Sequence, residues 1–194
     1  MEKNSRQCFK VVVVGESGVG KSAVIDMYCN NKFAESKNPT IGSGHFAKTV
    51  QTEKGSINLS LWDTAGQERF QSMIPMYIRG AKACILVVDL TAKVCLNELS
   101  IYYDFLIENI EKNCVFILCG NKSDLLDIDT VSTQYKGWAS SRSMNYFKVS
   151  AKTGEYIDTM FLYTCEQLLE KAKSSDVAIT QTEIEVKTES KSCC

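Results

Sequence analysis

The chain has 194 residues, enough for one domain with a sizeable core and some chain to spare. Its formal net charge of −1 gives no reason to expect nucleic-acid binding, and a single histidine argues against a metal site built from histidines. The nine cysteines do not indicate a disulfide framework, because several lie inside apolar runs and the N-terminal residues lack a secretory leader. No apolar stretch has the length of a membrane-spanning helix, so we expect a protein of the reducing cytosol.

Short apolar runs alternate with helical patterns from about residue 8 to 173, which predicts an α/β fold with a mostly parallel sheet and helices on both faces. Strands are predicted at 9–14, 46–53, 56–63, 83–90, 114–121 and 146–149, and helices at 21–31, after Gly66, and at 97–112, 132–143 and 156–173. The Lys54-Gly55 pair indicates a hairpin, so we expect six strands with one antiparallel edge strand. Residues 1–7 form a short extension before the domain at 8–173, and the polar residues 174–194 are expected to be a disordered tail.

Residues 15–22 read Gly-Glu-Ser-Gly-Val-Gly-Lys-Ser, which fits the phosphate-loop pattern G-x-x-x-x-G-K-[ST]. The backbone N–H groups of such a loop close around phosphate oxygens, and glycines keep that approach open. The loop joins a predicted buried strand to a predicted helix, which argues against a chance glycine-rich turn. We expect phosphate contacts from Gly15, Ser17, Gly18, Val19, Gly20, Lys21 and Ser22, with the Ser22 hydroxyl also a Mg²⁺ ligand.

A second pattern, Asp63-Thr64-Ala65-Gly66-Gln67, stands at the end of the strand predicted at 56–63. An Asp in this place can hold Mg²⁺ through a water molecule. The backbone N–H of Gly66 can approach a γ-phosphate, and Gln67 is the candidate catalytic residue because its amide can orient an attacking water. An isolated Asp at a strand end is more often a turn former, but the phosphate loop favours the catalytic interpretation.

Residues 121–124 read Asn-Lys-Ser-Asp and follow a strand that ends on the same sheet edge as the phosphate loop. Asp124 can accept hydrogen bonds from N1 and the exocyclic amine of guanine, whereas adenine would leave this carboxylate unpaired. Lys122 can lie along the base and sugar, and the backbone of 150–152 can reach the guanine O6. Each motif alone is compatible with a surface turn, but their order favours a guanine site. The predicted contacts are Asn121, Lys122, Asp124, Ser150, Ala151 and Lys152.

In this order and spacing the motifs resemble the Ras superfamily of small GTPases, and most closely the Rab family, over residues 9–173. The resemblance implies a GTP/GDP switch with Mg²⁺ that hydrolyses GTP slowly and recruits effectors in vesicle traffic while GTP is bound. It also implies that Thr40 ligates Mg²⁺ and senses the γ-phosphate, and that Phe33 lies against the guanine. Segments 62–70, 77–81 and 86–91 are Rab-like throughout.

The resemblance further implies an effector surface that contains Ile41, Gly42, Phe46, Trp62 and Tyr77. Rab proteins usually follow the Ile-Gly of switch I with a hydrophobic residue, Asp and Phe, but this chain reads Ser-Gly-His-Phe over 43–46. Phe46 therefore falls one place late. Either His45 takes the aromatic position, or Gly44 allows a β-bulge and a shortened turn at 54–55 restores the spacing.

The last two residues, Cys193 and Cys194, resemble the double geranylgeranylation site of Rab proteins. From Lys171 the tail holds four basic and four acidic residues, so two lipids would be needed for stable anchoring. The implied location is the cytoplasmic face of endomembranes, with a cytosolic pool. The implied partners are an exchange factor, an activating protein, GTP-dependent effectors, and prenylation escort and GDP-dissociation inhibitor proteins.

Three other functions compete with this interpretation. The chain could be a constitutive nucleotide-bound scaffold or a Ras-like signalling GTPase. A phosphate-loop kinase or ATPase is disfavoured by the guanine-type motif at 121–124.

Overall fold

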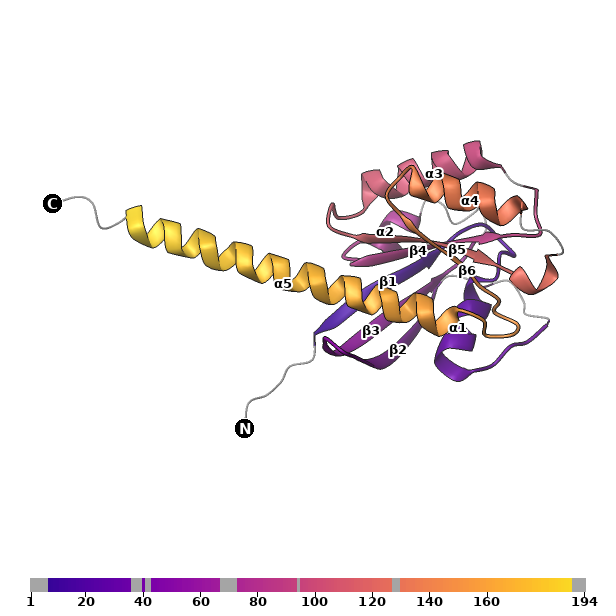
Figure 1. Cartoon of the computed structure of the whole chain (residues 1–194), viewed down its shortest axis with the longest axis horizontal. Coiled ribbons are helices and arrows are strands. Elements are labelled where there is room, and N and C mark those ends of the chain that lie inside the picture. The colour runs from indigo at the N-terminus through magenta and orange to yellow at the C-terminus, as the bar shows by residue number, and fades with distance from the viewer. Residues whose placement is uncertain are drawn as a thin grey trace.

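A computed structural model describes residues 7–35, 40, 43–66, 73–93, 95–126 and 130–189, without the side chains of 130 and 175–189. The strands are β1 (Cys8–Val14), β2 (Ser43–Thr52), β3 (Gly55–Thr64), β4 (Ala83–Asp89), β5 (Val115–Asn121) and β6 (Asn145–Lys148). The helices are α1 (Lys21–Asn30), α2 (Ile74–Ile78), α3 (Leu96–Asn109), α4 (Thr130–Ser140) and α5 (Ile157–Glu189), with a 3₁₀ turn, η2, at Ser123–Leu125. Figure 1 shows the strands at the centre of the domain.

The six strands form one sheet in the order β2-β3-β1-β4-β5-β6. Only the β2–β3 pair is antiparallel, and every other pair is parallel. The predicted fold class is therefore confirmed. Because the parallel strands all end on one edge, the loops that follow β1, β4, β5 and β6 gather there.

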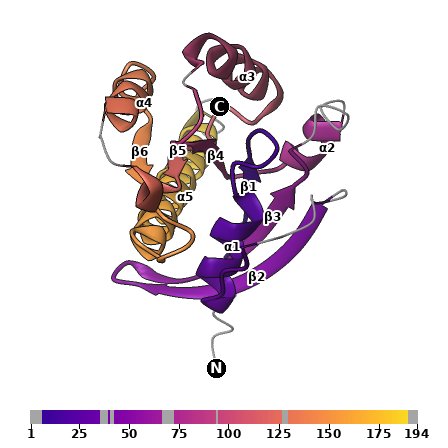
Figure 2. The ribbon, with the colours of Figure 1, turned by 90° about the vertical axis from the view of Figure 1, so that its right-hand side faces the viewer.

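Strand β1 shows why both faces of the sheet are covered. Successive side chains of a strand point to opposite faces, and all four valines of 11–14 are buried. Val11 and Val13 pack in the core that contains residues of α1 and α5, whereas Val12 and Val14 pack in the core that contains residues of α2, α3 and α4. Figure 2 shows these two groups of helices on opposite sides of the sheet.

An aromatic stack joins α1 to α5. The rings of Tyr28 and Phe161 are 3.8 Å apart and nearly parallel, and Phe161 is fully buried. The Nζ of Lys48, on β2, lies 3.7 Å from the Tyr28 ring centroid and donates to the Tyr28 carbonyl at 2.5 Å. Burying a side chain as large as phenylalanine contributes about 2–3 kcal/mol. The stack thus fixes α1, which begins at the phosphate loop, against the long C-terminal helix.

The pairing of β2 with β3 is unbroken. It runs from Ser43 opposite Thr64 to Thr52 opposite Gly55, so the strands are joined by a two-residue turn. A β-bulge would place two residues of one strand opposite one of the other. There is none in β2, and the bulge suggested for Gly44 is wrong.

Helix α5 is longer than the sequence predicts. Its backbone continues to Glu189, whereas the composition favours a disordered tail that begins at residue 174. Among its described side chains, which end at Ser174, the last buried one is Leu169. Residues 174–189 contain neither glycine nor proline, so local hydrogen bonds can continue the helix away from the domain (Figure 1). Within the described part of the chain, no helix is both long and apolar enough to cross a membrane.

Candidate functional site

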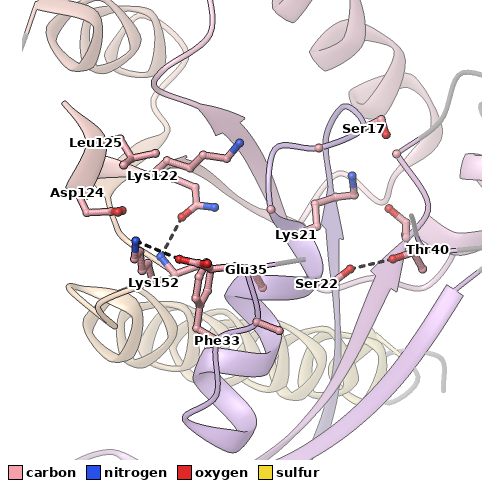
Figure 3. Close-up of a pocket in the computed structure, with 18 residues that line it drawn as sticks. Ser17, Lys21, Ser22, Phe33, Glu35, Thr40, Lys122, Asp124, Leu125 and Lys152 are labelled. Carbon is pink, nitrogen blue, oxygen red and sulfur yellow. Dashed lines mark hydrogen bonds and ion pairs between the residues drawn. The ribbon is translucent and has the colours of Figure 1, made fainter. Parts of the chain in front are cut away.

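A cavity of about 340 Å³ lies at the sheet edge where the parallel strands end. Figure 3 shows its two ends: Ser17, Lys21, Ser22 and Thr40 on one side, and Phe33, Lys122, Asp124 and Lys152 on the other. Its volume falls in the range of small-molecule sites. Its lining comprises Ser17, Gly18, Gly20, Lys21, Ser22, Ala23, Phe33, Ala34, Glu35, Thr40, Thr64, Gly66, Asn121, Lys122, Asp124, Leu125, Ala151 and Lys152.

The loop between β1 and α1 has the geometry of a phosphate cradle. Gly20 precedes the helix with a φ of +97°, a conformation that disfavours any residue with a side chain. A Cβ there would also overlap the amide nitrogen of Asn121. Gly20, Lys21 and Ser22 line the cavity, so the positive end of the α1 dipole faces it, as anion binding requires.

Lys21 is the positive charge of this loop. It is buried, and its Nζ donates to the carbonyl oxygens of Gly15 at 2.9 Å and Glu16 at 2.6 Å. Burial lowers the pKa of Lys21 to about 8, against the opposing attraction of Asp63 and Glu16. An anionic phosphate in the cavity would stabilise the charged form of this lysine.

Three oxygen-bearing side chains from separate segments converge beside Lys21. The Ser22 hydroxyl donates to Asp63 Oδ2 at 2.6 Å and lies 2.8 Å from Thr40 Oγ1. Ser22 opens α1, Asp63 lies near the end of β3, and Thr40 belongs to the segment between α1 and β2. The structure thus brings together the three predicted Mg²⁺ residues. No cluster of three or more His, Cys, Asp or Glu side chains able to hold a metal occurs in the described ranges.

Gly66 lies directly over the phosphate loop. A Cβ at this position would overlap the carbonyl oxygen of Glu16 and the Nζ of Lys21. Only a glycine therefore lets the backbone after β3 approach the lysine so closely. The Gly66 backbone is placed where it can sense whether the loop holds a terminal phosphate.

Asn121 connects the loops at the two ends of the cavity. Its side-chain nitrogen donates to the Val19 carbonyl at 2.9 Å, and its side-chain oxygen accepts from the Ala151 N–H at 3.0 Å. At the base end, the Ser150 hydroxyl donates to Asp124 Oδ1 at 2.6 Å. This bond orients the exposed Asp124 carboxylate, which can then accept the two N–H groups of a guanine edge.

Lys122 is held by a residue that the sequence analysis did not identify. Its Nζ lies 2.5 Å from Asp89 Oδ2, while Asp89 Oδ1 accepts from the Thr91 N–H and hydroxyl at 2.8 and 2.7 Å. Burial raises the pKa of Asp89, but the hydrogen bonds from Lys122 and Thr91 outweigh it and lower this pKa below its ordinary value. Asp89 is therefore a charged partner for the lysine at neutral pH.

Other contributors to the site were also missed. Glu35 lies 3.7 Å from Lys152 across the cavity mouth, although both side chains are exposed. The Tyr102 hydroxyl, on α3, is hydrogen-bonded to the Gly15 backbone. Neither Glu35 nor Tyr102 belongs to a nucleotide motif, and only the fold brings Glu35 to Lys152 and Tyr102 to the phosphate loop. The cavity lining adds Ala23, Ala34, Thr64 and Leu125.

Some predicted site residues do not line the cavity, and others lie outside the described residues. Gly15, Val19 and Ser150 support it through the bonds above. Gln67, Ile41, Gly42, Cys193 and Cys194 lie outside the described residues, and their roles stay predictions.

Phe46, which is predicted for the effector surface, is half-buried on the face of β2 opposite that of His45, and its role stays a prediction. Phe46 pairs with Leu61 and packs in the core on the α1 and α5 face, because the register places even-numbered β2 residues there. His45 is the residue opposite Trp62, and the two rings meet edge to face with centroids 5.3 Å apart. His45 therefore occupies the aromatic position. Tyr77, on α2, is buried.

A phosphate cradle with its lysine at one end of a cavity, and a carboxylate suited to guanine at the other, define a phosphate-loop protein that binds guanine nucleotides. Comparison with known sequences identifies the family. Residues 10–170 match the sequence model of the Ras family, and the chain belongs to that family.

Its relatives include Rab proteins. It is 34% identical over 190 residues to Ras-related protein RABG3f of Arabidopsis thaliana. This alignment covers 94% of the present chain and 92% of the relative. It is also 34% identical over 170 residues to Ras-related protein Rab-4B of Homo sapiens. That alignment covers 87% of the present chain and 80% of the relative. The chain is a Rab-like small GTPase, a GTP- and GDP-binding enzyme that hydrolyses GTP and acts in membrane trafficking.

Proposed function

We propose that this GTPase is a Mg²⁺-dependent switch whose Thr40 segment closes on the nucleotide in the GTP state and recruits effectors. The observation that carries the proposal is the 2.8 Å contact between Thr40 Oγ1 and Ser22 Oγ. It links the segment before β2 to the first turn of α1. A γ-phosphate would hold that segment in place, and its loss on hydrolysis would release it.

Mg²⁺ fits the donors at this place. Ser22, Thr40 and Asp63 offer only hard oxygen atoms, which Mg²⁺ prefers over nitrogen or sulfur. The two hydroxyls would ligate the ion directly and Asp63 through water. When bound, the ion would neutralise charge on the phosphate oxygens.

For hydrolysis, Lys21 would bind the phosphates between their β and γ positions, and the Gly66 N–H would donate to the γ-phosphate. Gln67 would orient the attacking water. The described residues that line the cavity include no arginine, and an activating protein would supply one, accelerating hydrolysis by about 10³–10⁵-fold. Replacing Gln67 with Leu should trap the GTP state, and an unchanged hydrolysis rate would remove Gln67 from this role.

Family membership supports the remaining partners of this proposal. An exchange factor would release GDP, and prenylation escort and GDP-dissociation inhibitor proteins would handle lipids on Cys193 and Cys194. Two lipids would anchor the protein to the cytoplasmic face of endomembranes, with an inhibitor-bound cytosolic pool. Replacing both cysteines with Ser should move the protein entirely to the cytosolic fraction, and membrane retention of that variant would contradict the anchor.

The switch itself is tested by affinity capture. Full-length protein loaded with a non-hydrolysable GTP analogue or with GDP is used to capture partners, which are compared by mass spectrometry. Partners specific to the analogue form, and lost on Thr40→Ala, would support the proposal. Identical partners for both forms would instead favour the constitutive scaffold.

A further inference from the structure

The face of β2 and β3 opposite α1 and α5 presents polar side chains to solvent. Odd-numbered residues of β2, from Ser43 to Gln51, are exposed, whereas the even-numbered residues between them are half-buried on the helix-covered face. Thr49 and Asn58 pair across the strands by a 2.8 Å hydrogen bond. Near the end of this face lie His45 and Trp62, next to the proposed switch segment.

His45 is fixed by a short hydrogen-bond chain. The Trp62 indole N–H donates to Ser60 Oγ at 3.1 Å, and Ser60 Oγ lies 2.9 Å from His45 Nε2. The serine hydroxyl has one proton, and donating it to Nε2 satisfies all three groups. We assign this arrangement from the hydrogen-bond chain; in it neutral His45 carries its proton on Nδ1, and the charged imidazolium carries one there too. In both forms Nδ1 is a hydrogen-bond donor.

The charge around His45 also favours an acceptor. Lys10 Nζ lies 4.4 Å from the Trp62 ring centroid and donates to the Arg79 carbonyl at 2.9 Å, which brings the backbone of an exposed arginine close. The described residues of this face on β1, β2 and β3 include no Asp or Glu. Among these described residues, a partner group that approaches Trp62 meets the Lys10 ammonium and no carboxylate.

We propose that His45 selects the partners of this surface, and that it favours a protein segment with an Asp or Glu next to an apolar side chain. The carboxylate would accept from His45 Nδ1–H and lie near Lys10, while the apolar side chain would cover the Trp62 indole. Such charge-assisted hydrogen bonds are about twice as strong as neutral ones. A phenylalanine at position 45 could contact Trp62 equally well but could not donate. The inference rests on the proposed function, because it assumes that this face is where partners dock.

The test is a selection from a randomised helical-peptide display library on the full-length protein, loaded with the GTP analogue or with GDP. We expect the analogue form to enrich peptides with Asp or Glu. A selected peptide should bind about tenfold more tightly than the same peptide with Asn or Gln in that place. In His45→Phe this preference should fall below about twofold, whereas Thr49→Val, a matched change on the same face, should keep it.

The outcomes separate the two proposals. Equal selection by the GTP-analogue and GDP forms would contradict the switch, and the acidic preference would still be measured on whichever peptides bind. Peptides without acidic residues, a preference that survives His45→Phe, or no selected peptide at all would overturn the role of His45.

Discussion

Asp89 and Lys122 offer a direct test of how the fold positions the guanine site. Their charged atoms are 2.5 Å apart, and their side chains are 15% and 32% exposed, so solvent screens the pair only in part. Asp89→Asn keeps the shape of the side chain but removes its charge. We expect Lys122 to lose the partner that holds it in place along the base, and GDP to dissociate faster.

The magnitude follows from the geometry. Hydrogen bonds to charged groups contribute about 1.5–3 kcal/mol, and the partial exposure of Lys122 places this one near the lower end. If the substitution destabilises only the GDP-bound state, a loss of about 1.5–2 kcal/mol corresponds to roughly 10- to 30-fold faster dissociation of GDP. Release of a fluorescent GDP derivative from the full-length protein measures this rate.

A double-mutant cycle separates positioning from general stability. In a Lys122→Ala background, Asp89→Asn should change the rate by less than about twofold, because the partner is already absent. Thr91→Val, which removes only the hydroxyl bond to the other Asp89 oxygen, should also have little effect. If Asp89→Asn accelerates release equally with and without Lys122, the reasoning is refuted.

Three further changes test other parts of the structure. Because the free protein holds the pKa of Lys21 near 8, below its usual 10.5, GDP binding above about pH 8 should require proton uptake and weaken by up to about tenfold per pH unit. Calorimetry in buffers of different ionisation enthalpy would detect that uptake, and its absence at about pH 9 would contradict the assigned pKa. Gly66→Ala should push the backbone away from Glu16 and slow GTP hydrolysis by about 100-fold while GDP affinity changes little, and equal losses in both would argue against a γ-phosphate contact. Phe161→Ala should lower the free energy of unfolding in urea by about 3–5 kcal/mol, since it empties the stack on Tyr28, and a loss below about 1 kcal/mol would mean that the core refills.

The sequence predicted that its nucleotide motifs meet at one sheet edge, because these motifs follow the ends of strands. A phosphate loop after β1 and a guanine-type motif at the end of β5 must meet, since parallel strands deliver both to one sheet edge. The Ser22–Thr40–Asp63 convergence follows from the same topology.

What sequence reasoning missed depends on register and on contacts between distant residues. Asp89 lies opposite Asn121 in the β4–β5 pairing, which is why its carboxylate reaches Lys122, but no motif contains both. The face on which Phe46 lies could not be predicted, because one residue of register decides the side and only the unbroken hairpin shows which register holds. The helical course of α5 beyond residue 173 depends on local hydrogen bonds that composition alone did not favour.

The alternation along β2 also bears on how this protein can diverge. Neighbouring residues of this strand meet different physical constraints, since His45 faces solvent while Phe46 contacts the core. If partners dock on this face as proposed, point substitutions at its odd positions would change partner choice and leave folding intact. A single-residue insertion or deletion between Ser43 and Thr52 would exchange the two sets and expose the core side chains. Partner specificity can therefore drift by substitution, while the length of this segment stays constrained.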